Sequence, residues 1–115
     1  MTHHTPDTTS IQKHCFKKWG CNIVFSRYSP VDKSIVLTEI TSKDPSKGKG
    51  SLCLQHIIKM LPGLGIEKIW LLAKPINGGD AFRLACWYMR HRFKIIKLNL
   101  GDFGEVESVE MERVL

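Results

Sequence analysis

The join between a β-rich segment and an apolar helical pattern constrains the fold more than any other feature of this sequence. Residues 46–51, with the sequence SKGKGS, follow a β-branched run that ends at Ser42 and precede a helical pattern that opens at Leu52. A strand that turns through glycines into a helix directs backbone N–H groups at one point, where the helix dipole also favours negative charge. Lys43 and the two lysines of the loop add positive charge. The join therefore predicts a site for a phosphate-bearing ligand.

Length and composition indicate one small folded unit. The 115 residues suit a single domain, and the apolar share of 43% and charged share of 24% are ordinary for a globular protein. No apolar run approaches the length that crosses a bilayer. The first ten residues are polar and lack the apolar stretch of a secretory signal. We therefore expect a flexible tail over residues 1–10, a single domain over residues 11–115, no membrane association and a cytoplasmic location.

The four cysteines show no C-x-x-C pairing, and the last two fall inside apolar helical patterns. This arrangement favours buried free thiols over disulfides or metal ligands. His3 and His4 have no further His or Cys at ligand spacing nearby. We therefore expect no metal site. The cysteines are Cys15, Cys21, Cys53 and Cys86.

The net charge of +6 raises the question of nucleic-acid binding, because clustered Lys and Arg neutralise phosphates. The basic clusters are short and scattered along the chain, and no recognition motif for DNA or RNA accompanies them. A basic surface around an anionic ligand explains the charge as well. A small basic nucleic-acid-binding protein therefore stays as a less favoured alternative.

Hydrophobic periodicity and turn residues predict helices and strands in the order α, β, β, α, β, α, β, β. Helices are expected over residues 11–19, 50–61 and 81–92, and strands over 21–28, 34–41, 66–73, 93–98 and 106–115. Ser10 and Asp80 are expected to cap the first and last helices, and Gly20 to end the first. Strands that alternate with helices predict an α/β fold, with a mixed, largely antiparallel central sheet and helices on both faces.

Two common phosphate-binding motifs do not fit the glycine loop. A Walker A loop needs lysine directly before Ser or Thr, whereas Lys49 is followed by Gly50. The Rossmann pattern needs a third glycine where this chain has Cys53, and the strand before the loop belongs to a hairpin. Taken alone, the loop could also be a surface turn with lysines by chance.

The loop and its neighbours nevertheless carry a family resemblance. Residues 45–50 (PSKGKG) occupy the positions of a Q/R-x-x-G-x-G/A loop, Tyr88 stands four residues before Arg92 and Phe93, and residues 111–115 read M-x-R-x-L. In this order the motifs resemble the GNAT N-acetyltransferase superfamily, over residues 21–115. Two positions depart from the family's pattern: Pro45 replaces Gln or Arg and has no N–H to donate, and Arg92 replaces a glycine before the phenylalanine.

The resemblance implies a GNAT fold that binds acetyl-coenzyme A (acetyl-CoA) and transfers the acetyl group directly to a primary amine, without a metal or a covalent enzyme adduct. It implies that the pyrophosphate is held by the backbone N–H groups of Lys47, Gly48, Lys49, Gly50 and Ser51, the last of which could add its hydroxyl.

Two further coenzyme contacts follow from the same resemblance. Ile40, near the end of the strand before the loop, would pair its backbone with the pantetheine arm. Asn77 would contact the coenzyme, or alternatively cap its own loop.

Two side chains are candidates for the chemistry. By resemblance, Tyr88 protonates the departing thiolate, although its helical face also suits a core aromatic. Glu39 is the carboxylate nearest in sequence to the expected thioester and would take a proton from the amine, or stand as a solvated strand residue. Asp32, His56 and His91 are weaker candidates for this base.

Two other readings stay open at this point. Pro45, Arg92 and a short N-terminal part are compatible with a catalytically inactive coenzyme-binding protein. Phe16, Trp19 and the last strand could bury a partner surface in a homodimer.

Overall fold

The computed structural model describes residues 5–43, 47–75 and 79–115. The helices are α1 (Thr9–Trp19), α2 (Lys49–Met60), a short 3-10 helix η2 (Leu61–Leu64) and α3 (Ala81–Arg90), and the strands are β1 (Cys21–Ser29), β2 (Ser34–Ser42), β3 (Lys68–Ala73), β4 (Lys94–Leu100) and β5 (Val106–Val114). The strand order is β1-β2-β3-β5-β4. Neighbouring strands β2 and β3 are joined through α2, the kind of connection that parallel strands need, whereas β1–β2 and β4–β5 are antiparallel. The mixed sheet expected from the sequence is confirmed.

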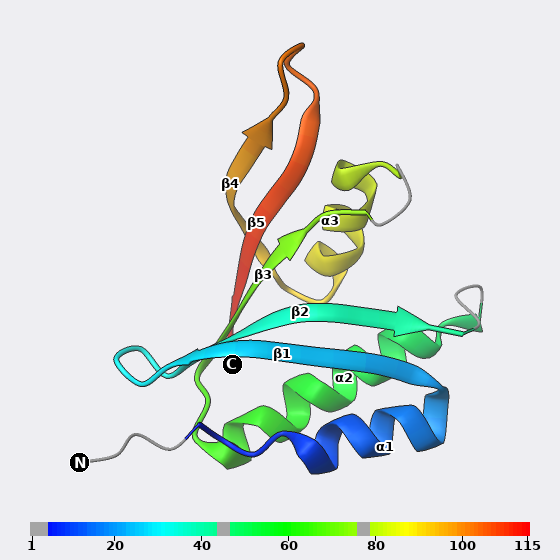
Figure 1. Ribbon diagram of the computed structural model, residues 1–115, viewed down its shortest axis with the longest axis vertical. Coiled ribbons are helices and arrows are strands. Elements are labelled where there is room, and N and C mark those ends of the chain that lie inside the picture. The colour runs from blue at the N-terminus through cyan, green and yellow to red at the C-terminus, as the bar shows by residue number, and fades with distance from the viewer. Residues whose placement is uncertain (1–4, 44–46, 76–78) are drawn as a thin grey trace. The chain divides into compact units, whose positions relative to one another are not determined.

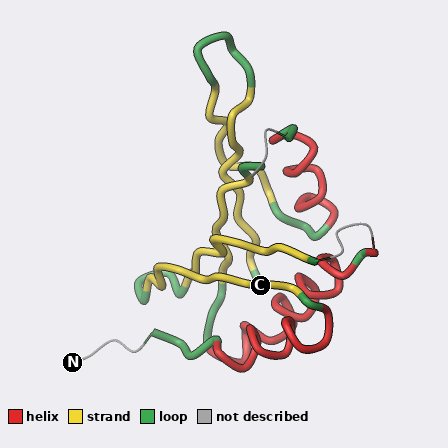
Figure 2. The backbone as a smooth tube through the Cα atoms, turned by 45° about the vertical axis from the view of Figure 1, so that its right-hand side comes forward, coloured by secondary structure: helices red, strands yellow, loops and turns green. Residues whose placement is uncertain are grey.

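The chain divides into two compact units, the first made of residues 1–69 with Leu115 and the second of residues 70–114. In the first unit the β1–β2 hairpin is covered by α1 and α2, which lie side by side (Figures 1 and 2). The core between helices and hairpin is formed by fully buried side chains, including Cys15, Cys53, Leu54 and Ile57. The expectation of buried free thiols is confirmed for Cys15, Cys21 and Cys53, and Cys86 is free and half-buried.

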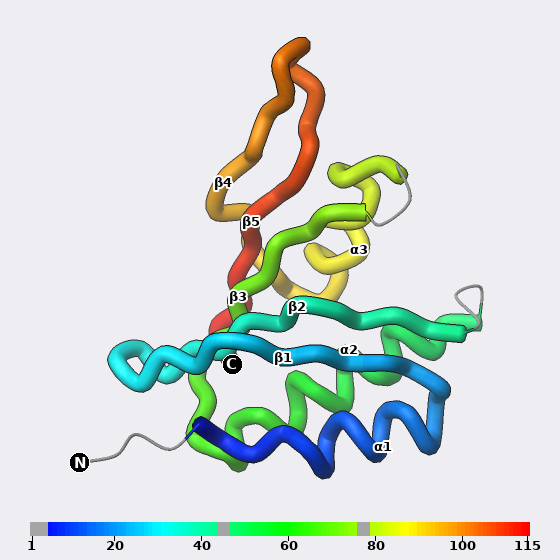
Figure 3. Tube along the Cα trace, viewed as in Figure 1, coloured from blue at the N-terminus to red at the C-terminus, as the bar shows by residue number. Residues whose placement is uncertain are grey.

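In the second unit the β4–β5 hairpin packs against α3, and its strands can be followed from orange to red in Figure 3. Val109 and Met111 of β5 are fully buried, as is Ala85 of α3. Side chains of β4 are mostly exposed. The apolar contact of this hairpin with α3 therefore comes mainly from β5.

The first helix begins earlier than the sequence predicts. Helix α1 starts at Thr9, so Ser10 lies inside the helix and is not its cap, and the helix reaches into the predicted tail. The position before the helix is Thr8, without a side-chain cap, while the Asp7 carboxylate accepts from Thr9 N–H at 2.9 Å. The other end is as expected, because Gly20 adopts the left-handed conformation (φ 65°) and its N–H donates to Phe16 O.

Candidate functional site

The N-terminus of α2 has the geometry that a phosphate site needs. Gly48 stands immediately before the helix in the left-handed conformation (φ 67°), and no side chain caps this end within the described residues. The helical ladder begins with the bond from Leu52 N–H to Gly48 O at 3.3 Å. The N–H groups of the first turn, from Lys49 to Ser51, therefore lie at the positive end of the helix dipole, together with the cationic Lys49 side chain.

Glycine at position 48 is required by conformation. A Cβ there would meet no atom of residues 5–43, 47–75 or 79–115 within 4 Å, so crowding among these residues does not explain the glycine. The positive φ does, because the left-handed conformation costs a non-glycine residue roughly 1–2 kcal/mol.

A β-bulge in β2 decides which way Glu39 and Ile40 face. Leu37 pairs with Phe25 and Glu39 pairs with Val24, so Thr38 is an extra residue in β2. Without this bulge Glu39 would continue the alternation of the buried Ile35 and Leu37 and point into the core. The bulge turns Glu39 to the other face of the hairpin.

With that register, Ile40 pairs with the buried Ile23 on the face that α1 and α2 cover. Both Glu39 and Ile40 are half-buried. They lie on the strand that leads into the glycine loop, as the sequence predicts.

Asn22 is a partner of Glu39 that sequence reasoning missed. Asn22 Nδ2 donates to Glu39 Oε2 at 2.9 Å across the β1–β2 hairpin. This bond orients the carboxylate and leaves its second oxygen for another partner. Nothing in the sequence marks Asn22, because the contact depends on the register that the Thr38 bulge creates.

Tyr88 lies in the second unit, on the buried face of α3. Asp80 begins this helix by accepting from Phe82 N–H (2.9 Å) and Arg83 N–H (3.3 Å), as predicted. The Tyr88 side chain is only 7% exposed and meets the Phe93 ring edge-on, with 5.5 Å between centroids. Burial raises the pKa of the Tyr88 phenol to about 12.

The end of α3 is a Schellman motif built around Tyr88. Phe93 N–H donates to Tyr88 O (3.3 Å) and Arg92 N–H donates to Met89 O (2.9 Å). Arg92 occupies the left-handed position (φ 65°). This is the position before Phe93 where the sequence pattern described above has a glycine. The contact between Phe93 and Tyr88 rings is the apolar contact that accompanies this motif.

Arg113 of β5 secures the same helix end. Its Nη1 donates to the backbone carbonyl of His91, one of the carbonyls at the negative end of the α3 dipole. Burial and the nearby Arg92 lower the pKa of Arg113, and burial and the Arg113 charge lower the pKa of His91. The arginine of the M-x-R-x-L motif thus has a structural role here, in holding the turn that follows Tyr88.

The structure places the predicted residues in two groups. Lys47, Gly48, Lys49, Gly50 and Ser51, with Glu39 and Ile40, belong to the first unit, and Tyr88 belongs to the second. Asn77 and Pro45 lie outside the described residues. The described residues contain no group of three or more His, Cys, Asp or Glu side chains that could hold a metal ion. Within the same residues, no helix is long and apolar enough to span a membrane.

The geometry to be compared with known proteins is a mixed sheet and a helix that begins after an αL glycine. No protein-family model and no curated protein matches the sequence. Solved structures do match, and they are acetyltransferases. The chain has the GNAT fold.

Three of these solved structures illustrate the similarity. An IAA acetyltransferase from Bacillus cereus aligns with a TM-score of 0.62 at 18% identity, over 81% of this chain and 68% of that chain. The PaiA N-acetyltransferase of Thermoplasma acidophilum, in complex with coenzyme A, aligns with 0.60 at 18% identity, over 83% of this chain and 53% of that one. An acetyltransferase of the GNAT family from Streptococcus pneumoniae aligns with a TM-score of 0.59 at 19% identity, over 83% of this chain and 58% of that chain. At these identities the likeness establishes the fold, and activity has to be argued from the residues.

Proposed function

We propose that this protein is an N-acetyltransferase that moves an acetyl group from acetyl-CoA directly to a primary amine. The observation that carries the proposal is the αL glycine at the start of α2 in a chain with the GNAT fold. That glycine opens a helix N-terminus that has no acidic residue in its first turn and carries Lys49 there. Such an end attracts a pyrophosphate.

In the proposed complex, the backbone N–H groups from Lys47 to Ser51 hold the pyrophosphate, and the Ser51 hydroxyl adds a contact. The backbone of Ile40, beyond the β2 bulge, pairs with the pantetheine arm as another strand would. Asn77 is proposed as a further contact to the coenzyme. Acetyl-CoA is thus the cosubstrate, and the amine acceptor is the second substrate.

Tyr88 is proposed to act on the sulfur of the departing coenzyme. With a pKa of about 12 the phenol is fully protonated at neutral pH and ready to donate. An ordinary thiol has a pKa of about 8.5, so full proton transfer from Tyr88 is uphill by roughly 3.5 units. Tyr88 therefore acts chiefly by a hydrogen bond that strengthens as negative charge develops on the sulfur.

Glu39 is proposed as the base. The amine attacks the thioester carbonyl, the tetrahedral intermediate loses a proton from nitrogen to the carboxylate, and collapse expels the thiolate. The bond from Asn22 Nδ2 holds one carboxylate oxygen and leaves the other to accept that proton. Asn22 is in this scheme a positioning residue.

Calorimetry with acetyl-CoA and with desulfo-CoA, followed by thiol release with a panel of primary amines, tests the proposal. Saturable binding that Gly48→Ala weakens, with amine-dependent thiol release, is the expected result. Binding without release by any amine would identify a coenzyme-binding protein that has lost catalysis. Failure to bind the coenzyme at all would refute the proposed function.

A further inference from the structure

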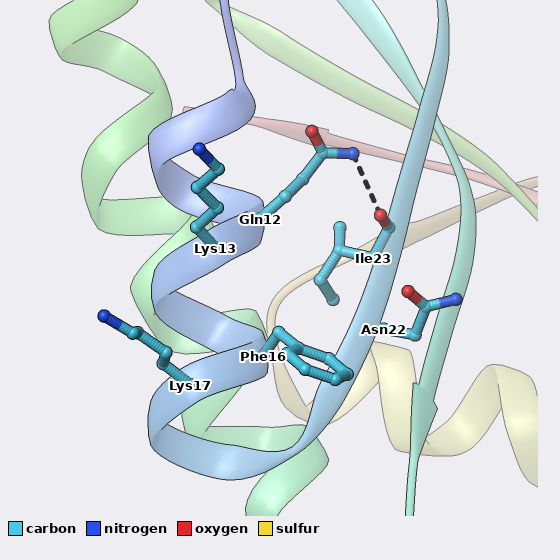
Figure 4. Close-up of a pocket in the computed structure, with 6 residues that line it drawn as sticks. All are labelled: Gln12, Lys13, Phe16, Lys17, Asn22 and Ile23. Carbon is cyan, nitrogen blue, oxygen red and sulfur yellow. Dashed lines mark hydrogen bonds between the residues drawn. The ribbon is translucent and has the colours of Figure 1, made fainter.

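A pocket of about 380 Å³ lies between α1 and β1. It is lined by Gln12, Lys13, Phe16, Lys17, Asn22 and Ile23. In Figure 4 the Phe16 ring lies beside Ile23, and the lysine ammonium groups extend from the far side of α1. Gln12 Nε2 donates to Ile23 O at 3.0 Å and ties the helix to the strand. The pocket thus has an apolar floor, and two lysines of α1 are among the residues that line it.

Phe16 gives this pocket a flat, accessible surface. Its side chain is 53% exposed, although a phenyl ring on a helix ordinarily turns toward the core. The Lys43 Nζ atom lies 5.3 Å from the ring centroid, within the range of a cation–π contact. A flat ring beside a cation suits a ligand that is itself flat and anionic.

The helical layer that contains the pocket is positive throughout. Helices α1 and α2 together hold five lysines, two histidines and no carboxylate. A solvated surface ordinarily mixes both signs of charge. Lysines of both helices therefore gather on one layer of the first unit.

A second group of rings lies on the same layer. The imidazoles of His14 and His56 stack at 4.2 Å between centroids, and the Trp19 ring meets them edge-on at 5.4 and 5.7 Å. Lys18 Nζ lies 5.3 Å from the Trp19 ring centroid. The layer thus holds two places where a lysine ammonium group lies near an aromatic ring, and proteins that bind single strands combine such cations with rings.

We propose that the α1–α2 layer binds single-stranded nucleic acid, with one base in the pocket against Phe16 and the phosphates along Lys13, Lys17 and Lys43. A concave pocket admits a base only when it is unstacked, which favours a single strand. A duplex fits less well, because α1 packs on both β1 and α2 and does not project to enter a groove. The exposed large apolar side chains of the two helices are Phe16, Leu52 and Met60, too few for an inserted amphipathic face on a membrane.

Fluorescence anisotropy with a labelled oligonucleotide of about fifteen nucleotides measures the binding on the full chain. Phe16→Ala should weaken it by about 5- to 150-fold, and Phe16→Trp should preserve it, since stacking tolerates any large ring. Lys17→Gln should reduce the slope of log affinity against log salt by about 0.7. The matched control is Lys97→Gln, which changes an exposed lysine of β4 in the second unit. It should leave the oligonucleotide affinity and its salt dependence unchanged.

Three results would overturn the proposal. The first is an oligonucleotide affinity that Phe16→Ala and Phe16→Leu leave unchanged. The second is equal weakening of coenzyme A binding by Phe16→Ala, which would place the adenosine of the coenzyme on this ring. The third is Phe16-dependent binding to vesicles of phosphatidylcholine and phosphatidylserine without binding to the oligonucleotide. Coenzyme affinity measured separately keeps this test independent of the proposed acetyl transfer.

Discussion

Replacing Arg92 by glycine should stabilise the protein, although it removes a whole side chain. Arg92 holds a left-handed conformation (φ 65°), which costs an L-residue about 1–2 kcal/mol. Glycine removes this cost but loses more conformational entropy on folding, which offsets roughly 0.5–1 kcal/mol of the gain. The substitution also removes the positive charge that lowers the pKa of Arg113. The expected gain is about 1 kcal/mol in the free energy of unfolding, or about 4 °C in Tm.

Urea and thermal unfolding followed by circular dichroism measure this gain, with two matched variants. Arg92→Ala removes the same charge but keeps a Cβ, so it should leave the backbone strain in place and gain little. Arg90→Gly, in the last turn of α3, should instead destabilise by about 1 kcal/mol, because glycine is a poor helix former. Equal gains from Arg92→Ala and Arg92→Gly would refute backbone strain as the cause and leave charge repulsion in its place.

Three further predictions concern the proposed site and its support. Tyr88→Phe should lower turnover by about 10- to 100-fold, because one hydrogen bond to a developing anion is lost. Calorimetry should show an unchanged affinity for the coenzyme. Gly48→Ala should cost about 1 kcal/mol of stability and weaken coenzyme binding, whereas Gly63→Ala, at an ordinary φ with open space, should do neither. Burial and the nearby charges of His14 and lysines lower the pKa of His56, so the unfolded chain takes up its proton first. The stability that this histidine contributes above about pH 6.5 should be lost as the pH falls through its folded-state pKa. Urea unfolding at a series of pH values measures this, and His56→Gln should make the free energy of unfolding depend less on pH.

Much of the fold could be predicted from local signals. Gly20 and Asp80 end and begin their helices as expected, because an αL glycine and an N-terminal carboxylate act through bonds to their own neighbours. The start of α1 could not be predicted in this way, because a helix can begin at Thr8, Thr9 or Ser10 and tertiary packing determines which of them is used.

The candidate site divides along the same line. The glycine loop before α2 and the helix face of Tyr88 follow from sequence spacing, whereas the αL conformation of Gly48 and the direction of Glu39 do not. Strict alternation after Ile35 and Leu37 would bury a carboxylate, and the structure avoids that cost by inserting Thr38 as a bulge. Bulges depend on pairing between strands, so a single sequence carries no direct signal for them.

Irregular backbone therefore positions both side chains proposed for the chemistry. The Thr38 bulge turns Glu39 away from the core, and the Schellman turn at Arg92 fixes the helix end that carries Tyr88. The bulge and the turn differ in cost. The bulge interrupts the hydrogen-bond ladder between β1 and β2, whereas the turn keeps backbone strain at Arg92 that a glycine would remove. If Arg92→Gly gains stability and leaves turnover unchanged, the strain at the end of α3 is incidental to catalysis. If it gains stability and loses turnover, the strained turn itself sets the position of the phenol.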